Sequence, residues 1–149
     1  MSRQRRWAAR LGGPEEGSAA IEMAVLTPGL LLLLALIVAA GRVETAGGAV
    51  ETAAHSAARA ASLARTEAAG QSAARTAAAA SLTGQHLSCS RLTVTVNTAG
   101  LSAPLGRQGQ VSAAVACQVG LSDLLIPGLP GSVTQSRTFV SAVDPYRGR

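Results

Sequence analysis

The sequence predicts an α+β fold in which a long N-terminal helix is followed by a small three-stranded antiparallel sheet. Residues 23–41 form an uncharged apolar run, and residues 43–83 are rich in alanine and contain no proline. Three segments rich in β-branched residues come after Gly84. Alanine is the strongest helix former, whereas alternating β-branched residues favour strands. The chain is therefore expected to be helical first and β-rich last.

The apolar run at residues 23–41 is long enough to cross a membrane. Its 19 residues extend about 28 Å as a helix at ~1.5 Å per residue, against a hydrocarbon core about 30 Å thick. Four arginines precede the run, and the positive-inside rule keeps such a flank in the cytoplasm: Arg3, Arg5, Arg6 and Arg10. We therefore expect residues 42–149 on the extracytoplasmic side of a single-pass cell-membrane protein.

Two ordinary interpretations of this segment compete. A secretory signal peptide would end at the small residues 38–40, and cleavage after Ala40 would release a small secreted binding protein. An uncleaved single-span anchor would instead leave a membrane-attached stalk. Neither explains Glu22 at the start of the apolar run, because an acidic side chain costs up to about 2.5–3.5 kcal/mol at mid-membrane and less near the interface.

The stretch around Glu22 resembles the class III signal of type IV pilins and pseudopilins. In that family a prepilin peptidase cuts after a glycine and leaves glutamate at the fifth mature position; here these are Gly17 and Glu22, and Ser18 becomes the N-terminus. Glu22 lies one helical turn from Ser18, so its carboxylate can pair with the new ammonium group or with that of a neighbouring subunit. The resemblance implies that this pairing sets the register of a subunit joining a pilus. Ser18 departs from the aromatic first residue of typical type IV pilins.

The wider stretch is similar to the TadE-like proteins of the tight-adherence (Flp) pilus system. Those proteins carry a proline step inside the apolar helix and a glycine–arginine exit, found here as Leu26-Thr27-Pro28 and Gly41-Arg42-Val43. The ending VDPYR, residues 143–147, is also similar to short members. The resemblance implies a minor pseudopilin with a pilin-like head. Its implied partners are a prepilin peptidase, the major pilin, other minor pseudopilins, the inner-membrane assembly platform and membrane lipid.

Pro28 and the alanine-rich stretch set the expected shape of the helix. Pro28 lacks an amide hydrogen and is expected to kink the membrane segment. Polar residues of the stretch recur every three or four positions and mark an exposed stripe: Glu44, Glu51, His55, Arg59, Ser62 and Thr66. Its opposite face is narrow and made of valine and alanine: Val43, Val50, Ala54, Ala57, Ala61, Ala64 and Ala68. Gly47, Gly48 and Gly70 are its expected weak points.

Alanine buries too little area to make such a helix stable alone. We expect the part near the membrane to pack with other subunits, and the part from about Ala60 onward to cover the sheet. The helix is expected to end at Thr83-Gly84, because glycine commonly follows the last helical residue.

Three strands are expected after Gly84. Residues 91–97 alternate between apolar and polar side chains, and a second run again places its apolar residues on one face: Val111, Ala113, Val115, Cys117, Val119 and Leu121. Residues 133–143 form a third, less regular run. The loop between the last two strands carries Leu124, Leu125 and Ile126, which either cover the sheet or contact a partner.

Cys89 and Cys117 are the two cysteines, and both follow the apolar run into a compartment that permits disulfides. A bridge would close a loop of about 28 residues and stabilise the fold by roughly 3–4 kcal/mol. A zinc site would recruit His86 as a third ligand but lacks a fourth at a suitable spacing. The disulfide is therefore the better interpretation.

The sequence carries no signature of an enzyme, a cofactor or a metal site. It has no nucleophile with a positioned base, no paired carboxylates and no glycine-rich nucleotide motif. Its net charge of +5 comes from thirteen arginines, but aromatic stacking residues do not interleave with them as on nucleic-acid-binding surfaces. We therefore expect a non-catalytic protein without a nucleic-acid partner. Its expected parts are a leader (1–17), a transmembrane and assembly helix (18–41), a stem (42–83) and an exported head (84–149).

Overall fold

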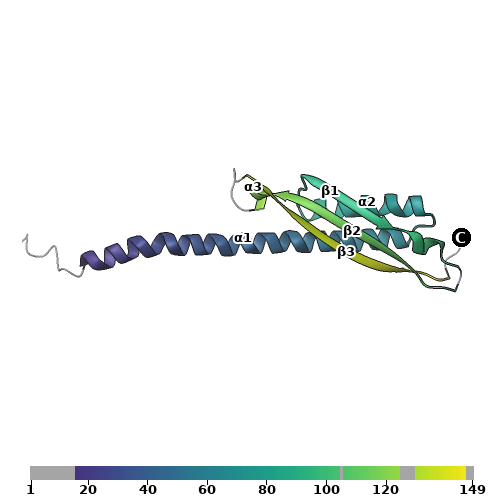
Figure 1. The fold of residues 1–149 in the computed structure, drawn as a ribbon, viewed down its shortest axis with the longest axis horizontal. Coiled ribbons are helices and arrows are strands. Elements are labelled where there is room, and N and C mark those ends of the chain that lie inside the picture. The colour runs from purple at the N-terminus through teal and green to yellow at the C-terminus, as the bar shows by residue number, and fades with distance from the viewer. Residues whose placement is uncertain (1–15, 105, 125–129, 147–149) are drawn as a thin grey trace, which may run out of the picture. The chain divides into compact units, whose positions relative to one another are not determined.

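The computed structural model describes residues 16–104, 106–124 and 130–146 (Figure 1). Its elements in chain order are α1 (Glu16–Ser62), α2 (Glu67–Gly84), β1 (Arg91–Asn97), the 3-10 helix η2 (Ala99–Ser102), β2 (Gly109–Gly120), α3 (Leu121–Leu124) and β3 (Ser132–Val143). The predicted α+β fold is confirmed, with an additional short helix between the long helix and the sheet. The chain divides into two compact units, residues 1–40 and residues 41–149.

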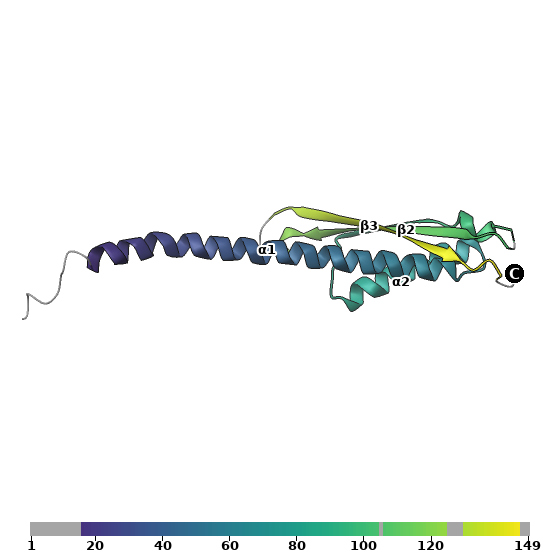
Figure 2. The same cartoon turned by 90° about the horizontal axis from the view of Figure 1, so that it is seen from below.

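Within residues 41–149, α2 folds back along the C-terminal part of α1. The side-chain amide of Gln85, just after α2, donates to the carbonyl of Ala49 at 3.3 Å. At the other end of α2, a Cβ placed on Gly70 would lie 3.4 Å from the carbonyl oxygen of Ala61. These two contacts make the helices antiparallel, as Figures 1 and 2 show.

The expectation of one uninterrupted helix over residues 43–83 is wrong, because the helix breaks at residues 63–66. The break does not fall at any of the glycines expected to be weak. It falls before Thr66, whose side chain accepts a hydrogen bond from the amide of Ala69 at 3.2 Å and caps α2. Glu67 follows in the first turn, where its charge suits the helix dipole. Turning here lets the alanine face of α2 be buried against the rest of this unit, which a single straight helix would not do.

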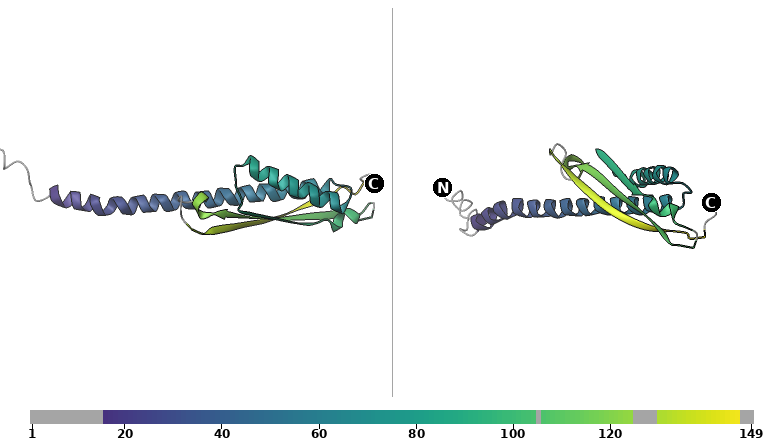
Figure 3. Two further views of the ribbon diagram at one scale, coloured as in Figure 1. Left: turned by 90° about the horizontal axis from the view of Figure 1, so that it is seen from above. Right: turned by 45° about the vertical axis from the view of Figure 1, so that its right-hand side comes forward.

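The sheet has the order β1-β2-β3, and both pairings are antiparallel. The central strand β2 alternates strictly, with its odd-numbered residues buried from Gly109 to Val119. In the register Val94 lies opposite Val115, and Cys117 lies opposite Leu92. The apolar face of β2 predicted from the sequence is confirmed, except that Leu121 lies in α3 and is half-buried. Figure 3 shows the sheet lying across one side of the helical pair, with β2 between its neighbours.

Half of the buried apolar residues in the described part of the chain are alanines from the two helices. The buried helical alanines are Ala46, Ala49, Ala53, Ala54, Ala57, Ala58, Ala61, Ala74 and Ala78. All of these except Ala49 pack with the valines of β2 and with Leu82 and Leu101 in one cluster. This packing begins at Ala46, so the expectation that α1 covers the sheet only from about Ala60 is wrong. The reason is that β3 reaches back along α1 as far as Gly47, where Gln135 and Arg137 approach the helix.

The polar stripe predicted on α1 is largely confirmed. Glu44, Glu51, His55 and Arg59 are exposed. Ser62 differs, because it is 8% exposed and its hydroxyl accepts a hydrogen bond from Ser141 at 3.1 Å. That bond satisfies a polar group that the end of α1 buries against β3.

Close backbone approach between η2 and β2 gives a prediction about stability. A Cβ added at Gly100 would collide with the backbone of Gln110, whereas one added at Gly48 would meet nothing within 4 Å. Gly100→Ala should therefore lower the free energy of unfolding by about 1–3 kcal/mol through overpacking. Gly48→Ala should raise it by about 0.5–1 kcal/mol, because alanine is the better helix residue. Thermal unfolding of the full chain in detergent measures both, and equal effects would contradict the close approach.

Candidate functional site

The N-terminal part of α1 carries the residues that the sequence singles out. Gly17 and Ser18 lie in the first turn of α1, which begins at Glu16. Glu22 follows on the same helix and is exposed. The leader arginines Arg3, Arg5, Arg6 and Arg10 lie outside the described residues. The bond predicted to be cleaved and the carboxylate one turn later therefore belong to one helical segment, rather than to separate elements.

The segment after Glu22 presents large apolar side chains on every side of the helix. All are at least half exposed, which is the opposite of a buried core helix: Ile21, Met23, Val25, Leu26, Leu30, Leu31, Leu32, Leu33, Leu34, Leu36, Ile37 and Val38. A helix that is apolar all round is suited to lipid. By length and composition, α1 is long and apolar enough from Ala20 onward to cross a membrane.

Pro28 lies inside α1, and the helix continues through it. Its missing amide hydrogen leaves the carbonyl of Ala24 without the usual helical donor. The neighbouring Thr27 hydroxyl donates to the carbonyl of Met23 at 2.6 Å, one residue earlier. Thr27 thus keeps its own polar group satisfied within the apolar segment. The kink expected at Pro28 stays a prediction.

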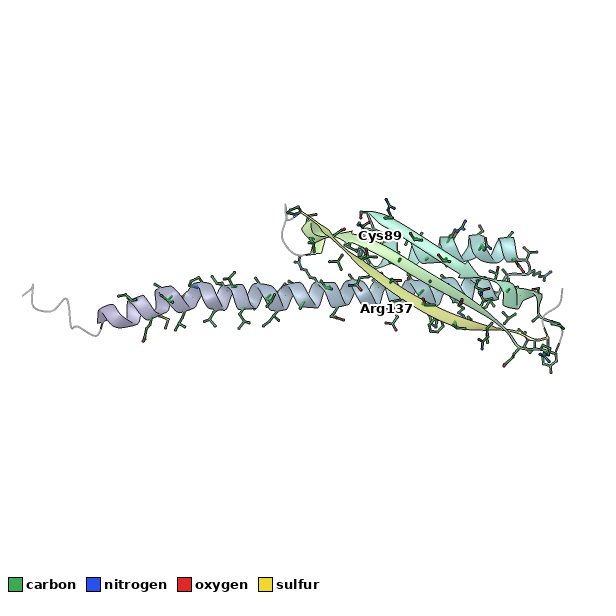
Figure 4. The ribbon with its side chains drawn as sticks, in the orientation of Figure 1. Cys89 and Arg137 are labelled. Atoms are coloured by element: carbon green, nitrogen blue, oxygen red, sulfur yellow. A yellow bond between two sulfur atoms is a disulfide. The ribbon has the colours of Figure 1, made fainter. Side chains whose placement is uncertain are left out.

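Cys89 and Cys117 form a disulfide, as predicted. Cys117 is fully buried in β2, and Cys89 lies half-buried just before β1, near its label in Figure 4. The bond joins the linker after α2 to the central strand. Because both sulfurs are bonded to each other, neither is available as a thiolate, which rules out the zinc interpretation with His86.

Two contacts between β3 and α1 were not foreseen from the sequence. The Arg137 guanidinium, labelled in Figure 4, lies 3.3 Å from where a Cβ of Gly47 would be. The ring of Phe139 packs on His55 with centroids 4.3 Å apart. From the sequence, Gly47 is expected only to be a weak point of the helix. The sequence signal for this contact is the glycine pair itself, because a helix that lacks side chains at neighbouring positions can be approached closely by another element. In the structure Gly47 is buried and Gly48 is exposed.

The linker after α2 bounds two neighbouring cavities. One, of about 340 Å³, is lined by Arg42, Thr45, Ala46, Ala49, Gln85, His86 and Leu87. The other, of about 540 Å³, is lined by Ala79, Leu82, Thr83, His86, Leu87, Ser88, Cys89 and Leu92. His86 and Leu87 border both, and His86 is exposed and has a positive φ of 56°. The expected apolar loop cannot be compared with them, because Leu125 and Ile126 and the side chain of Leu124 lie outside the described part.

Comparison with known families adds an independent observation on the N-terminal segment. The family model described as TadE-like protein matches residues 17–59. Residues 17–59 are TadE-like. The predicted resemblance is confirmed over this range, which runs from the proposed scissile glycine into the alanine part of α1. No curated protein and no solved structure gives a significant match.

The TadE-like match is consistent with a protein of the tight-adherence pilus system. The match covers α1 alone and stops before α2 and the sheet. It therefore applies to the apolar segment and to the part of α1 that lies within residues 41–149, as far as Arg59. It does not extend to Cys89, Cys117 or His86.

The disulfide gives a second stability prediction. Replacing both Cys89 and Cys117 with alanine opens a loop with a sequence separation of 28, which should cost roughly 3–4 kcal/mol of unfolding free energy. Thermal unfolding in detergent, with and without a reductant, measures the loss. Reductant should lower the melting temperature of the parent chain and leave the double variant unchanged. A parent chain that is insensitive to reductant would contradict a stabilising role.

Proposed function

We propose that this TadE-like chain is a minor pseudopilin, an assembly subunit of a tight-adherence pilus that a prepilin peptidase cuts between Gly17 and Ser18. Its apolar segment is inserted with the leader in the cytoplasm and residues 42–149 outside. The major pilin, other minor pseudopilins and the inner-membrane assembly platform are its partners. Its role is structural, and it is a substrate of an enzyme rather than an enzyme.

The observation that carries this proposal is that the TadE-like match begins at Gly17, the residue before the proposed cut. Two structural facts support it. The exposed Glu22 lies one turn along the same helix from Ser18, where it can meet the new N-terminal ammonium. The apolar side chains after it are exposed and can therefore pack against lipid or against other subunits.

A second candidate function is a secreted binding protein released after Ala40. The boundary between the two compact units favours this candidate, because the second unit starts at Gly41. A cut there would leave residues 41–149 with their alanine interior and disulfide intact. The two functions differ in the N-terminus of the mature chain, Ser18 or Gly41, and in whether Glu22 survives processing.

The site of cleavage can be read directly. In cells with a prepilin peptidase, the mature N-terminal peptide should begin at Ser18, and in cells without it the leader should remain. Gly17→Leu should block processing, because the bulky side chain stands at the scissile bond. Gly29→Leu is the matched control, since a Cβ added at Gly29 meets nothing within 4 Å. Mass spectrometry of the terminal peptide identifies the first residue of the mature chain. A start at Gly41 in both strains would contradict the pseudopilin function and support the secreted binding protein.

Glu22 is expected to matter for assembly and not for cleavage. Glu22→Gln should leave the start at Ser18 while lowering the amount of subunit in sheared pili by at least about tenfold, because removing one partner of a desolvated ion pair is costly. Glu44→Gln, on the exposed stripe of α1, is the control and should change neither quantity. Normal incorporation of the Glu22 variant would count against the pairing with the N-terminal ammonium.

A further inference from the structure

We propose that Cys89 is the sulfur at which the disulfide of this chain exchanges with a thiol–disulfide oxidoreductase, and that the open cavity beside Cys89 receives an extended segment of that enzyme. The partner class is a protein with a Cys-x-x-Cys redox pair. The proposal goes beyond the proposed function and does not depend on it, because a pseudopilin and a secreted binding protein would carry the same bond.

The two sulfurs of the bond differ in access. Cys117 is 0% exposed and belongs to the buried apolar cluster, on the same face of β2 as Val115 and Val119. Cys89, labelled in Figure 4, is only half-buried and lies outside the sheet, in the linker before β1. A thiolate attacks a disulfide sulfur from the side opposite the sulfur that leaves. An attack on Cys89 therefore comes from the linker side, whereas an attack on Cys117 would have to come through the interior.

The cavity of about 540 Å³ gives an approach to Cys89. Its lining joins Cys89 to α2 through Ala79, to the linker through Ser88 and to β1 through Leu92. Leu92 is 38% exposed, so the lining includes an apolar side chain that a partner can contact. Cys117 does not line this cavity. A protein segment placed here thus reaches one sulfur of the bond and not the other.

The backbone beside Cys89 is able to pair with such a segment. The amides of Leu87 and Ser90, on either side, donate hydrogen bonds within the chain. Those of Ser88 and Cys89 donate none to any part of the chain that the structure describes. These residues lead directly into β1, which is an edge strand of the sheet. An extended segment adds readily along an edge of this kind, because its own backbone groups pair with the unpaired ones.

The exchange balances in two steps. The first thiolate of the enzyme attacks Sγ of Cys89, a sulfur–sulfur bond forms between the two proteins, and Cys117 leaves as a thiolate that takes a proton from water. The second thiolate of the enzyme then attacks the first enzyme sulfur and releases Cys89, which is protonated in turn. Two electrons pass from the enzyme to the chain. The reverse sequence, with the oxidised enzyme, installs the bond and is the direction expected in a compartment that permits disulfides.

Trapping on the folded chain identifies the sulfur that reacts. The full chain in detergent, with its disulfide intact, is mixed with reduced thioredoxin whose second cysteine is replaced by serine, so that exchange stops at the mixed disulfide. Acid, unfolding and alkylation then fix the products. Trypsin separates the two cysteines, because it cuts after arginine and leaves Cys89 in residues 76–91 and Cys117 in residues 108–137. Mass spectrometry should find thioredoxin on the Cys89 peptide in at least about tenfold excess, since access decides which sulfur reacts.

Ala79 and Ala80 give matched variants for the cavity. Both are exposed on α2, but only Ala79 lines the cavity. Ala79→Trp should lower the rate of mixed-disulfide formation by at least about fivefold, because a bulky side chain closes the approach to Cys89. Ala80→Trp should leave the rate unchanged. Neither variant should change the melting temperature of the oxidised chain, because neither side chain points into the interior.

Four results would each overturn the proposal. They are thioredoxin on the two cysteine peptides in equal amounts, trapping only after the chain is unfolded in urea, equal effects of the two tryptophan variants, and glutathione reacting as fast as thioredoxin at equal thiolate concentration. The last would show open access without a docking site. The chain is prepared from cells without prepilin peptidase, so none of these results depends on the proposed cut at Gly17.

Discussion

Alanine is the most frequent buried residue in the described part of residues 41–149, and a methyl group buries so little area that it stabilises a fold only when backbones approach closely. This constraint explains why α2 folds back on α1 and why a sheet lies against both helices. It also explains the glycines at the tightest points, such as Gly70 against Leu101 and Gly100 against Gln110. Larger side chains at these positions would separate the layers and open the interior.

The same constraint gives the disulfide its importance. The fully buried side chains of largest volume are valines and Cys117, so the interior lacks the aromatic anchors that stabilise most small domains. A covalent bond between the linker and β2 compensates by restricting the unfolded chain rather than by adding buried area. The apolar segment of α1 follows a different rule, because its large side chains are exposed and suit lipid rather than a protein interior.

The elements set by local periodicity could be predicted from the sequence. The strict alternation around Val115 and the glycine at the end of α2 gave strand and helix bounds close to those observed. The sequence does not predict the helix break before Thr66 when only glycines are considered as helix breakers. Thr66 marks the break because it is the N-cap of α2. The burial of α1 from Ala46 was also missed, since it depends on how far β3 reaches along the helix, which no local pattern encodes.

The candidate site also contains residues that local sequence patterns predict and a cavity that they do not predict. Gly17, Ser18 and Glu22 were found because their spacing along one helix carries the signal, and the cysteine pair was found because there were only two. The cavity beside His86 could not be found, because it joins Arg42 to a linker more than forty residues later. The cavity forms only because α2 runs antiparallel to α1, which no local sequence pattern predicts.

The bond between Cys89 and Cys117 closes residues 89–117 into a covalent ring that contains β1, η2 and most of β2. A protease that cuts once inside this ring opens it without separating two fragments. Both ends of the cut remain attached to the same molecule through the sulfur atoms. For the exported protein proposed above, a single cut in this part of the chain would therefore break one peptide bond without releasing a fragment.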